Sequence, residues 1–116
     1  MSVIINGDSV ITSPLGIGFG GGNVTTNVAH GYQALNANTT GAGNTAIGYQ
    51  SLNTNTTGAQ NVANGYLALF ANTTGSYNVA AGTSALTSNT TGNSNIAIGN
   101  EALKSNTTAS WNIATG

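Results

Sequence analysis

The chain has 116 residues, of which 39% are hydrophobic and only 3% are charged, and its formal net charge is -1. Most soluble domains are roughly a quarter charged, so solubility here must rest on Asn, Thr, Ser and Gln, and self-association is expected. A net charge of -1 does not favour binding to nucleic acid or to an anionic membrane. The absence of cysteine excludes disulfides and thiolate metal sites.

Residues 1–26 are expected to form an attachment segment. Two β-branched runs flank Asn6-Gly7-Asp8-Ser9, a pattern that predicts a hairpin. A lone hairpin is marginal in water, so its apolar side chains need a partner surface. These side chains are Val3, Ile4, Ile5, Val10 and Ile11.

The same segment carries no secretory signal, since it lacks both a basic region and a long apolar region. No run approaches the ~18 apolar residues that span a bilayer, so we expect no membrane insertion. Pro14 ends the second run, and the glycine-rich residues 15–22 are expected to be a connector, either a hinge or a close-packed collar. No Lys-Ser/Thr follows these glycines, which argues against a phosphate loop.

Residues 27–116 repeat with a period of 17: five copies are complete and a sixth begins at Asn112. Position 1 of each copy is Asn, position 3 is Ala, position 5 is Gly and position 9 is Leu, and Asn-Thr-Thr closes each complete copy. A fixed period of this size predicts a solenoid. The expected fold is all-β: a parallel β-roll of 17-residue coils that begins at residue 27.

Position 2 is β-branched in every copy, so positions 1–4 predict a short strand with two alternating faces. We expect the branched side chain inside the coil and the invariant Ala against a neighbouring chain, since an Ala that never grows larger indicates a tightly packed face. Leu at position 9 is the second interior contact. The predicted packing and oligomer residues are Ala29, Ala46, Ala63, Ala80, Ala97, Leu35, Leu52, Leu69, Leu86 and Leu103. Three parallel coils around one axis satisfy this pattern most simply, which predicts a homotrimer.

Coils stacked one strand spacing apart place each Asn over the preceding one, which predicts a ladder of side-chain amides along the solenoid. Position 6 holds Tyr32, Tyr49 and Tyr66 in successive copies. This exposed aromatic column either grips sugar rings or covers the groove between chains.

Residues for catalysis are scarce. Asp8 and Glu101 lie too far apart in the chain to act as the paired carboxylates of a glycosidase, and His30 occupies a position that varies between copies. A metal held by three symmetry-related His30 side chains is a minor alternative. We expect no enzyme and no cofactor. The Asn-Thr-Thr triplets match the glycosylation pattern, but we interpret them as turns.

The segments Asn44 to Leu52 and Asn95 to Leu103 resemble repeats of tailed-bacteriophage tail fibres and, in their Ala-Ile-Gly core, the heads of trimeric autotransporter adhesins. The resemblance covers residues 27–116 and implies a trimeric, left-handed parallel β-roll that serves as a shaft or adhesive head. The signal peptide, coiled-coil stalk and membrane anchor of such adhesins are absent from this sequence, which favours the phage.

The resemblance therefore implies a virion structural protein at the particle surface, mounted on other virion proteins through residues 1–26 and contacting a glycan or protein of the host. Two alternatives remain. One is a bacterial adhesin head, and the other is a solenoid whose Thr columns, Thr39/Thr40 through Thr107/Thr108, bind ice or a crystalline polysaccharide.

Overall fold

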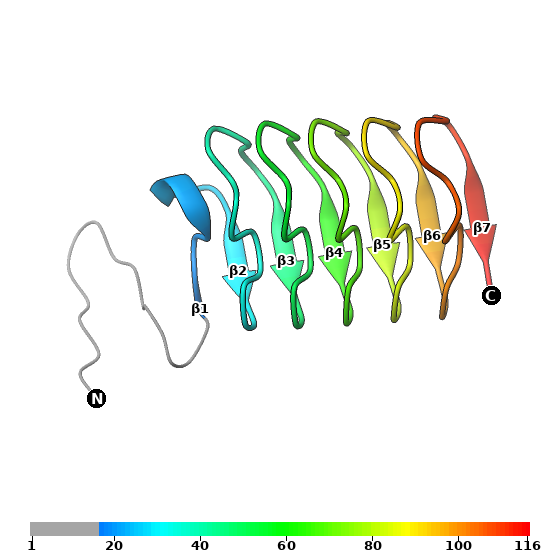
Figure 1. The fold of residues 1–116 in the computed structure, drawn as a ribbon, viewed down its shortest axis with the longest axis horizontal. Coiled ribbons are helices and arrows are strands. Elements are labelled where there is room, and N and C mark those ends of the chain that lie inside the picture. The colour runs from blue at the N-terminus through cyan, green and yellow to red at the C-terminus, as the bar shows by residue number, and fades with distance from the viewer. Residues whose placement is uncertain (1–16) are drawn as a thin grey trace.

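A computed structural model describes residues 17–116, with the side chain of Ile17 excepted, as an all-β solenoid of about five turns. The parallel β-solenoid that the repeat predicts is therefore confirmed (Figure 1). The hairpin predicted from Val3, Ile4, Ile5, Val10 and Ile11 lies outside the described residues.

Each 17-residue copy forms one coil with one three-residue strand. The strands are β2 (Val28–His30), β3 (Thr45–Ile47), β4 (Val62–Asn64), β5 (Val79–Ala81), β6 (Ile96–Ile98) and β7 (Ile113–Thr115). They pair in parallel and in register, so that Ala46 lies between Ala29 and Ala63. We call the coils by number: coil 1 begins at Asn27 and coil 5 at Asn95.

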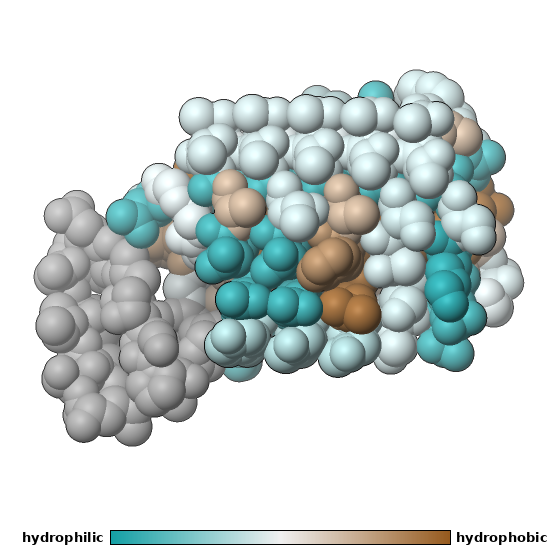
Figure 2. Space-filling model, in the orientation of Figure 1, coloured by the Kyte–Doolittle hydropathy of each residue, from teal (hydrophilic) through white to brown (hydrophobic). Residues whose placement is uncertain are grey.

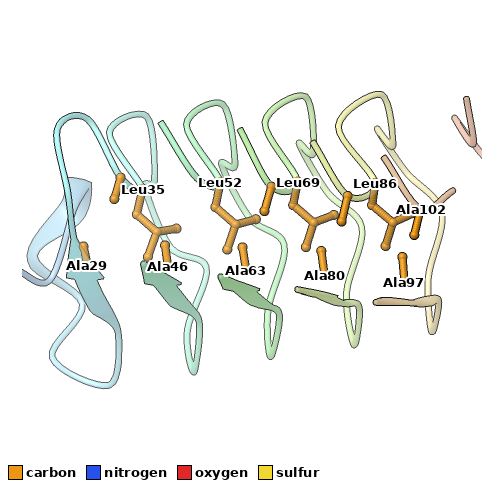
Figure 3. Packing of buried hydrophobic residues seen from close by; sticks show 13 residues of the cluster. Ala29, Leu35, Ala46, Leu52, Ala63, Leu69, Ala80, Leu86, Ala97 and Ala102 are labelled. Carbon is orange, nitrogen blue, oxygen red and sulfur yellow. The ribbon is translucent and has the colours of Figure 1, made fainter. Parts of the chain in front are cut away.

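The interior of the solenoid contains one Leu and two small residues from each coil (Figure 3). The position 9 Leu side chains of the first four coils are fully buried, and Leu103 packs against the same cluster. Position 3 is Ala in every coil, and position 8 is Ala or Ser. The buried interior residues are Ala29, Ala34, Leu35, Ala46, Ser51, Leu52, Ala63, Ala68, Leu69, Ala80, Ala85, Leu86, Ala97 and Ala102.

This interior corrects one prediction, because the faces of the strand are reversed. The sequence predicts the branched residue inside and the invariant Ala against a neighbouring chain. In the structure Ala46, Ala63 and Ala80 are fully buried within their own chain, whereas the branched residues point outward. The Ala stays small because the Leu of the same chain fills the thin interior opposite it, so no larger side chain fits.

Two ladders of buried asparagine run the length of the solenoid. At position 1, the Nδ2 group of each Asn from Asn61 to Asn112 donates to Oδ1 of the Asn one coil before, at 3.0–3.2 Å. At position 12, Asn55, Asn72, Asn89 and Asn106 make the same contact at 2.8–3.0 Å. The predicted amide ladder is therefore present twice.

The two ladders meet at the backbone carbonyl of position 15. In coil 3 the carbonyl oxygen of Gly75 accepts hydrogen bonds from Nδ2 of both Asn61 and Asn72. Among the described residues every buried side-chain nitrogen and oxygen has a hydrogen-bond partner. The amides therefore supply order that a thin apolar interior cannot supply alone.

The bend after each strand requires glycine at position 5. Gly65 has a φ of 141°, and a Cβ there would lie 2.5 Å from the carbonyl oxygen of Gly82. Position 9 also has an unusual backbone conformation, because its Leu residues adopt positive φ values of 49–51° although they carry side chains. Burial of the Leu side chain compensates for that backbone strain.

Residues 17–23 close the N-terminal end of the solenoid. Strand β1 (Ile17–Gly18) pairs antiparallel with β2, and the 3-10 helix η1 (Gly21–Asn23) lies on coil 1. The N–H of Gly21 donates to the carbonyl of Leu35 at 2.8 Å, and a Cβ at Gly21 would lie 2.5 Å from the carbonyl oxygen of Asn38. Of the two alternatives for this connector, the structure has the close-packed collar, and its glycines permit backbone contact with coil 1.

Candidate functional site

The outward face of the parallel sheet carries a regular series of exposed apolar side chains. It consists of positions 2 and 4, which flank the buried Ala on each of the strands β2 to β6. Six large aliphatic side chains on it are 36–75% exposed: Val28, Ile47, Val62, Ile96, Ile98 and Ile113. Exposed aliphatic side chains that gather on one face of a soluble protein indicate an interaction site.

The sequence contained a signal for this outward orientation. Positions 2 and 4 share one face of the strand, and position 4 includes His30, Asn64 and Thr115. The side chains at position 4 vary in size from Ala81 to His30, whereas a tightly packed interior that repeats in every coil needs side chains of constant size, so the whole face had to lie outside. The Ala and Leu columns, predicted as packing and oligomer residues, thus form the interior of a single chain, and the oligomer surface must be sought on positions 2 and 4.

A stacked tyrosine column runs along the first three coils. The ring centroids of Tyr32 and Tyr49 lie 5.6 Å apart with an interplanar angle of 15°, and those of Tyr49 and Tyr66 lie 5.3 Å apart at 11°. The rings are 44–63% exposed. Because each ring covers the next, Tyr49 offers a ligand only its edge and hydroxyl, and a free ring face exists only where the stack ends.

A second surface feature links positions 7 and 10, three residues apart in each coil. The two positions carry chemically matched side chains: Gln33 with Asn36, Gln50 with Asn53, Leu67 with Phe70, Ser84 with Thr87 and Glu101 with Lys104. In coil 5 the match is an ion pair with 3.0 Å between Lys104 Nζ and Glu101 Oε1. Figure 2 shows this face, with apolar surface gathered over the coil of β4. The matching was visible in the sequence, but only the structure shows that the two positions adjoin.

The two threonine columns differ in their freedom. At position 13 the hydroxyls of Thr39, Thr56, Thr73 and Thr90 donate to a backbone carbonyl one coil ahead at 3.1–3.2 Å. At position 14 every Thr is exposed: Thr40, Thr57, Thr74, Thr91 and Thr108. The solenoid therefore presents one row of free threonine side chains, while the other row is tied to its own backbone.

Among residues 17–116, the histidine and the charged side chains lie far apart. His30 is exposed at the outer face of β2, and Glu101 is paired with Lys104 four coils away. Residues 17–116 contain no group of three His, Cys, Asp or Glu side chains that could hold a metal ion. His30 and the pair of Glu101 with Lys104 therefore lie at opposite ends of the five coils.

The Asn-Thr-Thr triplets are structural in the fold. The Asn of each triplet is a ladder residue: Asn72, for example, is fully buried, and its Nδ2 donates to Asn55 Oδ1 at 2.8 Å and to the Gly75 carbonyl at 2.9 Å. A glycan on that nitrogen would displace these bonds and would need an exit from a closed interior. The triplets of the inner coils are therefore incompatible with glycosylation in the folded state.

Comparisons with protein-family models, with curated proteins and with solved structures found no match to this chain. Within residues 17–116, no helix has the length and apolar character needed to cross a membrane.

Proposed function

We propose that the chain is a structural fibre of a tailed bacteriophage, in which three copies associate through their outward sheet faces and project from the particle toward the host surface. Residues 1–26 mount the fibre on other virion proteins, and the coils form its shaft. The observation that carries this proposal is the apolar face at positions 2 and 4, where Val62 and Ile96 are exposed in the isolated chain although both are aliphatic.

A second copy of the same chain is the occupant that this face fits best. The face repeats at every strand and carries no formal charge, so an identical neighbour meets it in register with no like charges opposed. Three such faces turned toward a common axis form a closed assembly and leave no apolar face in water. Elsewhere on the coils, the charges of Glu101 and Lys104 neutralise each other, so copies have little electrostatic reason to separate.

A fibre outside the cell must resist bending and proteolysis. The asparagine ladders contribute to this resistance because they bond each coil to the next. Each coil is bonded to the next by strand pairing, by two buried amide contacts and by turn hydrogen bonds. Local opening of an inner coil must therefore break bonds to both neighbours. This favours a rigid shaft over a catalytic or switching module.

Native mass spectrometry of the full chain tests the assembly, and three times the 11.4 kDa chain mass is the expected species. A monomer at micromolar concentration would remove the proposal. Attachment is tested separately by adding fluorescently labelled chain to a panel of bacterial species. Saturable binding to a subset of the cells is expected, whereas equal adsorption to all of them, or to none, contradicts a host-attachment role.

The exposed threonine row supports a second candidate, a surface that binds ice or a crystalline polysaccharide. Thr57, Thr74 and Thr91 stand one coil apart on an ordered backbone, as a lattice-matching surface requires. The neighbouring row is committed to internal hydrogen bonds, which leaves a single free row. Thermal hysteresis in dilute solution would favour ice binding, and its absence together with no binding to microcrystalline cellulose or chitin removes this candidate.

A further inference from the structure

The tyrosine column ends abruptly at coil 3. Position 6 is Tyr in coils 1 to 3, Thr83 in coil 4 and Asn100 in coil 5. Tyr66 stacks on Tyr49 through one ring face, and on its other side the next coil offers only the short side chain of Thr83. The C-terminal face of the Tyr66 ring is therefore not covered by another aromatic ring, and Tyr66 is 51% exposed.

The stack holds this ring in a fixed orientation. Tyr66 lies within 11° of parallel to Tyr49, which is itself held between two rings, so the side chain cannot turn freely. An oriented aromatic face has lost its rotational entropy before a ligand arrives, which lowers the cost of binding. A single exposed Tyr on a loop would not have this property.

The surroundings of the free face are polar and uncharged. Thr83 is exposed, and its hydroxyl makes no hydrogen bond within residues 17–116, unlike those of Thr73 and Thr90. Asn100 is exposed one coil further along the same column. The face thus has a hydroxyl one strand spacing away, ~4.8 Å, and an amide at about twice that distance.

Beside Tyr66 in its own coil lie Leu67 and Phe70, the apolar pair of positions 7 and 10, both half-buried. Both belong to the coil of β4, over which apolar surface gathers in Figure 2. The corresponding pair in coil 4 is Ser84 and Thr87. The boundary between coils 3 and 4 is therefore aromatic and apolar on one side and hydroxyl-bearing on the other.

We propose that the free face of Tyr66, together with Thr83 and Asn100, binds one pyranose ring of a neutral glycan. A pyranose has an apolar face of C–H groups that stacks on an aromatic ring and a rim of hydroxyls that require donors and acceptors, and both are met here. A phosphorylated or carboxylated ligand is disfavoured because no unpaired cation lies nearby in the described coils: Lys104 is engaged by Glu101. The assignment to a host glycan rests on the proposed function, but the binding chemistry does not.

The competing occupant is an aromatic side chain of a second protein copy, which would extend the stack without need of hydroxyls. Thr83 and Asn100 distinguish the two, because an aromatic side chain gains nothing from their polar groups, whereas a sugar does. The polar residues at the open end of the stack therefore favour the sugar.

The test is a titration of the isotope-labelled full chain with methyl β-D-galactopyranoside and methyl β-D-glucopyranoside, followed by backbone amide NMR shifts. A saturable shift is expected at the amides of Tyr66, Thr83 and Ser84, with a dissociation constant of about 1 mM, which is typical of a single small contact. Tyr66→Ala should weaken binding at least about tenfold. Tyr32→Ala removes a ring from the far end of the same column and is the matched control, with binding expected unchanged.

Thr83→Tyr is the decisive variant, since it extends the stack by one ring and covers the free face of Tyr66 without loss of any buried group. Binding to the site should be lost while the folded amide spectrum is retained. The proposal would be overturned if the sugars shifted the amides of Thr83→Tyr as much as those of the unaltered chain, or if neither sugar caused a saturable shift. It would also be overturned if the amide signal of Tyr66 moved when the protein was diluted without sugar, because that would indicate an aromatic partner from another copy.

Failure of this site and failure of the fibre function give different results. If the assembled chain binds bacterial cells and Tyr66→Ala binds them equally, the site is wrong and the fibre function stands. If the sugars bind at Tyr66 while the chain adsorbs to no cells, the site stands and host attachment is wrong.

Discussion

Oδ1 of Asn44 accepts two hydrogen bonds from Asn61, one from its backbone N–H at 2.9 Å and one from its Nδ2 at 3.1 Å. Asn61 makes the same pair of contacts with the next coil through Asn78. One side-chain oxygen therefore accepts a hydrogen bond from a backbone N–H that strand pairing leaves free, and a second one from the side-chain amide of the next coil. This relationship repeats along the solenoid and explains why position 1 never varies.

Asn61→Ala should destabilise the solenoid by about 3 kcal/mol, because the buried N–H of Asn78 loses its acceptor. Asn112→Ala is the matched control, because Asn112 is only half-buried and its side chain donates to Asn95, while no backbone N–H of the described residues donates to its Oδ1. Its cost should stay below about 1 kcal/mol. Urea unfolding followed by far-UV circular dichroism measures both, and equal midpoints for the two variants would contradict a cooperative ladder.

The repeat period, the strand at positions 2–4, the interior Leu and the amide ladder could all be predicted from the sequence, because each is a local consequence of a 17-residue period. The constancy of Ala alone does not show which face of the strand points into the coil. An invariant small residue indicates tight packing but not its partner, and here the partner is Leu of the same chain. The variation in side-chain size at position 4, from Ala81 to His30, held the information that decides between the two.

The functional surfaces were predictable to a lesser degree. The Tyr column was visible in the sequence as residues one period apart. Whether the rings stack depends on side-chain geometry, which only the structure shows. Because the rings stack, the ring faces inside the column are not accessible to a ligand. The pairing of positions 7 and 10 follows from a turn in which positions 7 and 9 adopt positive φ, for example at Leu67 and Leu69. No sequence rule predicts positive φ at a leucine, because the conformation is held by packing against that residue's preference.

Gly65→Ala should destabilise the fold by about 3 kcal/mol or more, since a φ of 141° is closed to other residues and the new Cβ would lie 2.5 Å from the Gly82 carbonyl oxygen. Gly43→Ala is the control. Its φ is 70°, the nearest atom to a new Cβ is Gln60 Cγ at 3.5 Å, and Gln60 itself adopts a φ of 58° at the same position of the next coil. A cost of about 1 kcal/mol is expected there. Thermal unfolding of both variants checks the contrast, and a Gly43→Ala as damaging as Gly65→Ala would contradict the close approach of the coils.

Leu69→Ala should cost about 2–5 kcal/mol, because the side chain is fully buried and the thin interior has no other large group to fill the space. Leu67, two residues earlier and half-buried on the surface, provides the control, and Leu67→Ala should cost about 1 kcal/mol or less. Denaturant midpoints give the comparison. Equal stability of the two variants would contradict the finding that the Leu side chains of position 9 form the interior.

The outward sheet face can be tested without disturbing the interior by Val62→Lys combined with Ile96→Lys, both at exposed position 2. If three copies meet through this face, six ammonium groups would be brought together near one axis, and like-charge juxtaposition costs several kcal/mol. The trimer dissociation constant should then rise by at least about a hundredfold, with the circular dichroism spectrum of the coils unchanged. The control is Thr57→Lys combined with Thr74→Lys, which adds the same charge to the exposed position 14 row. Sedimentation velocity distinguishes the outcomes: a trimer that survives in the first variant, or one that dissociates equally in both, places the contact between copies somewhere other than positions 2 and 4.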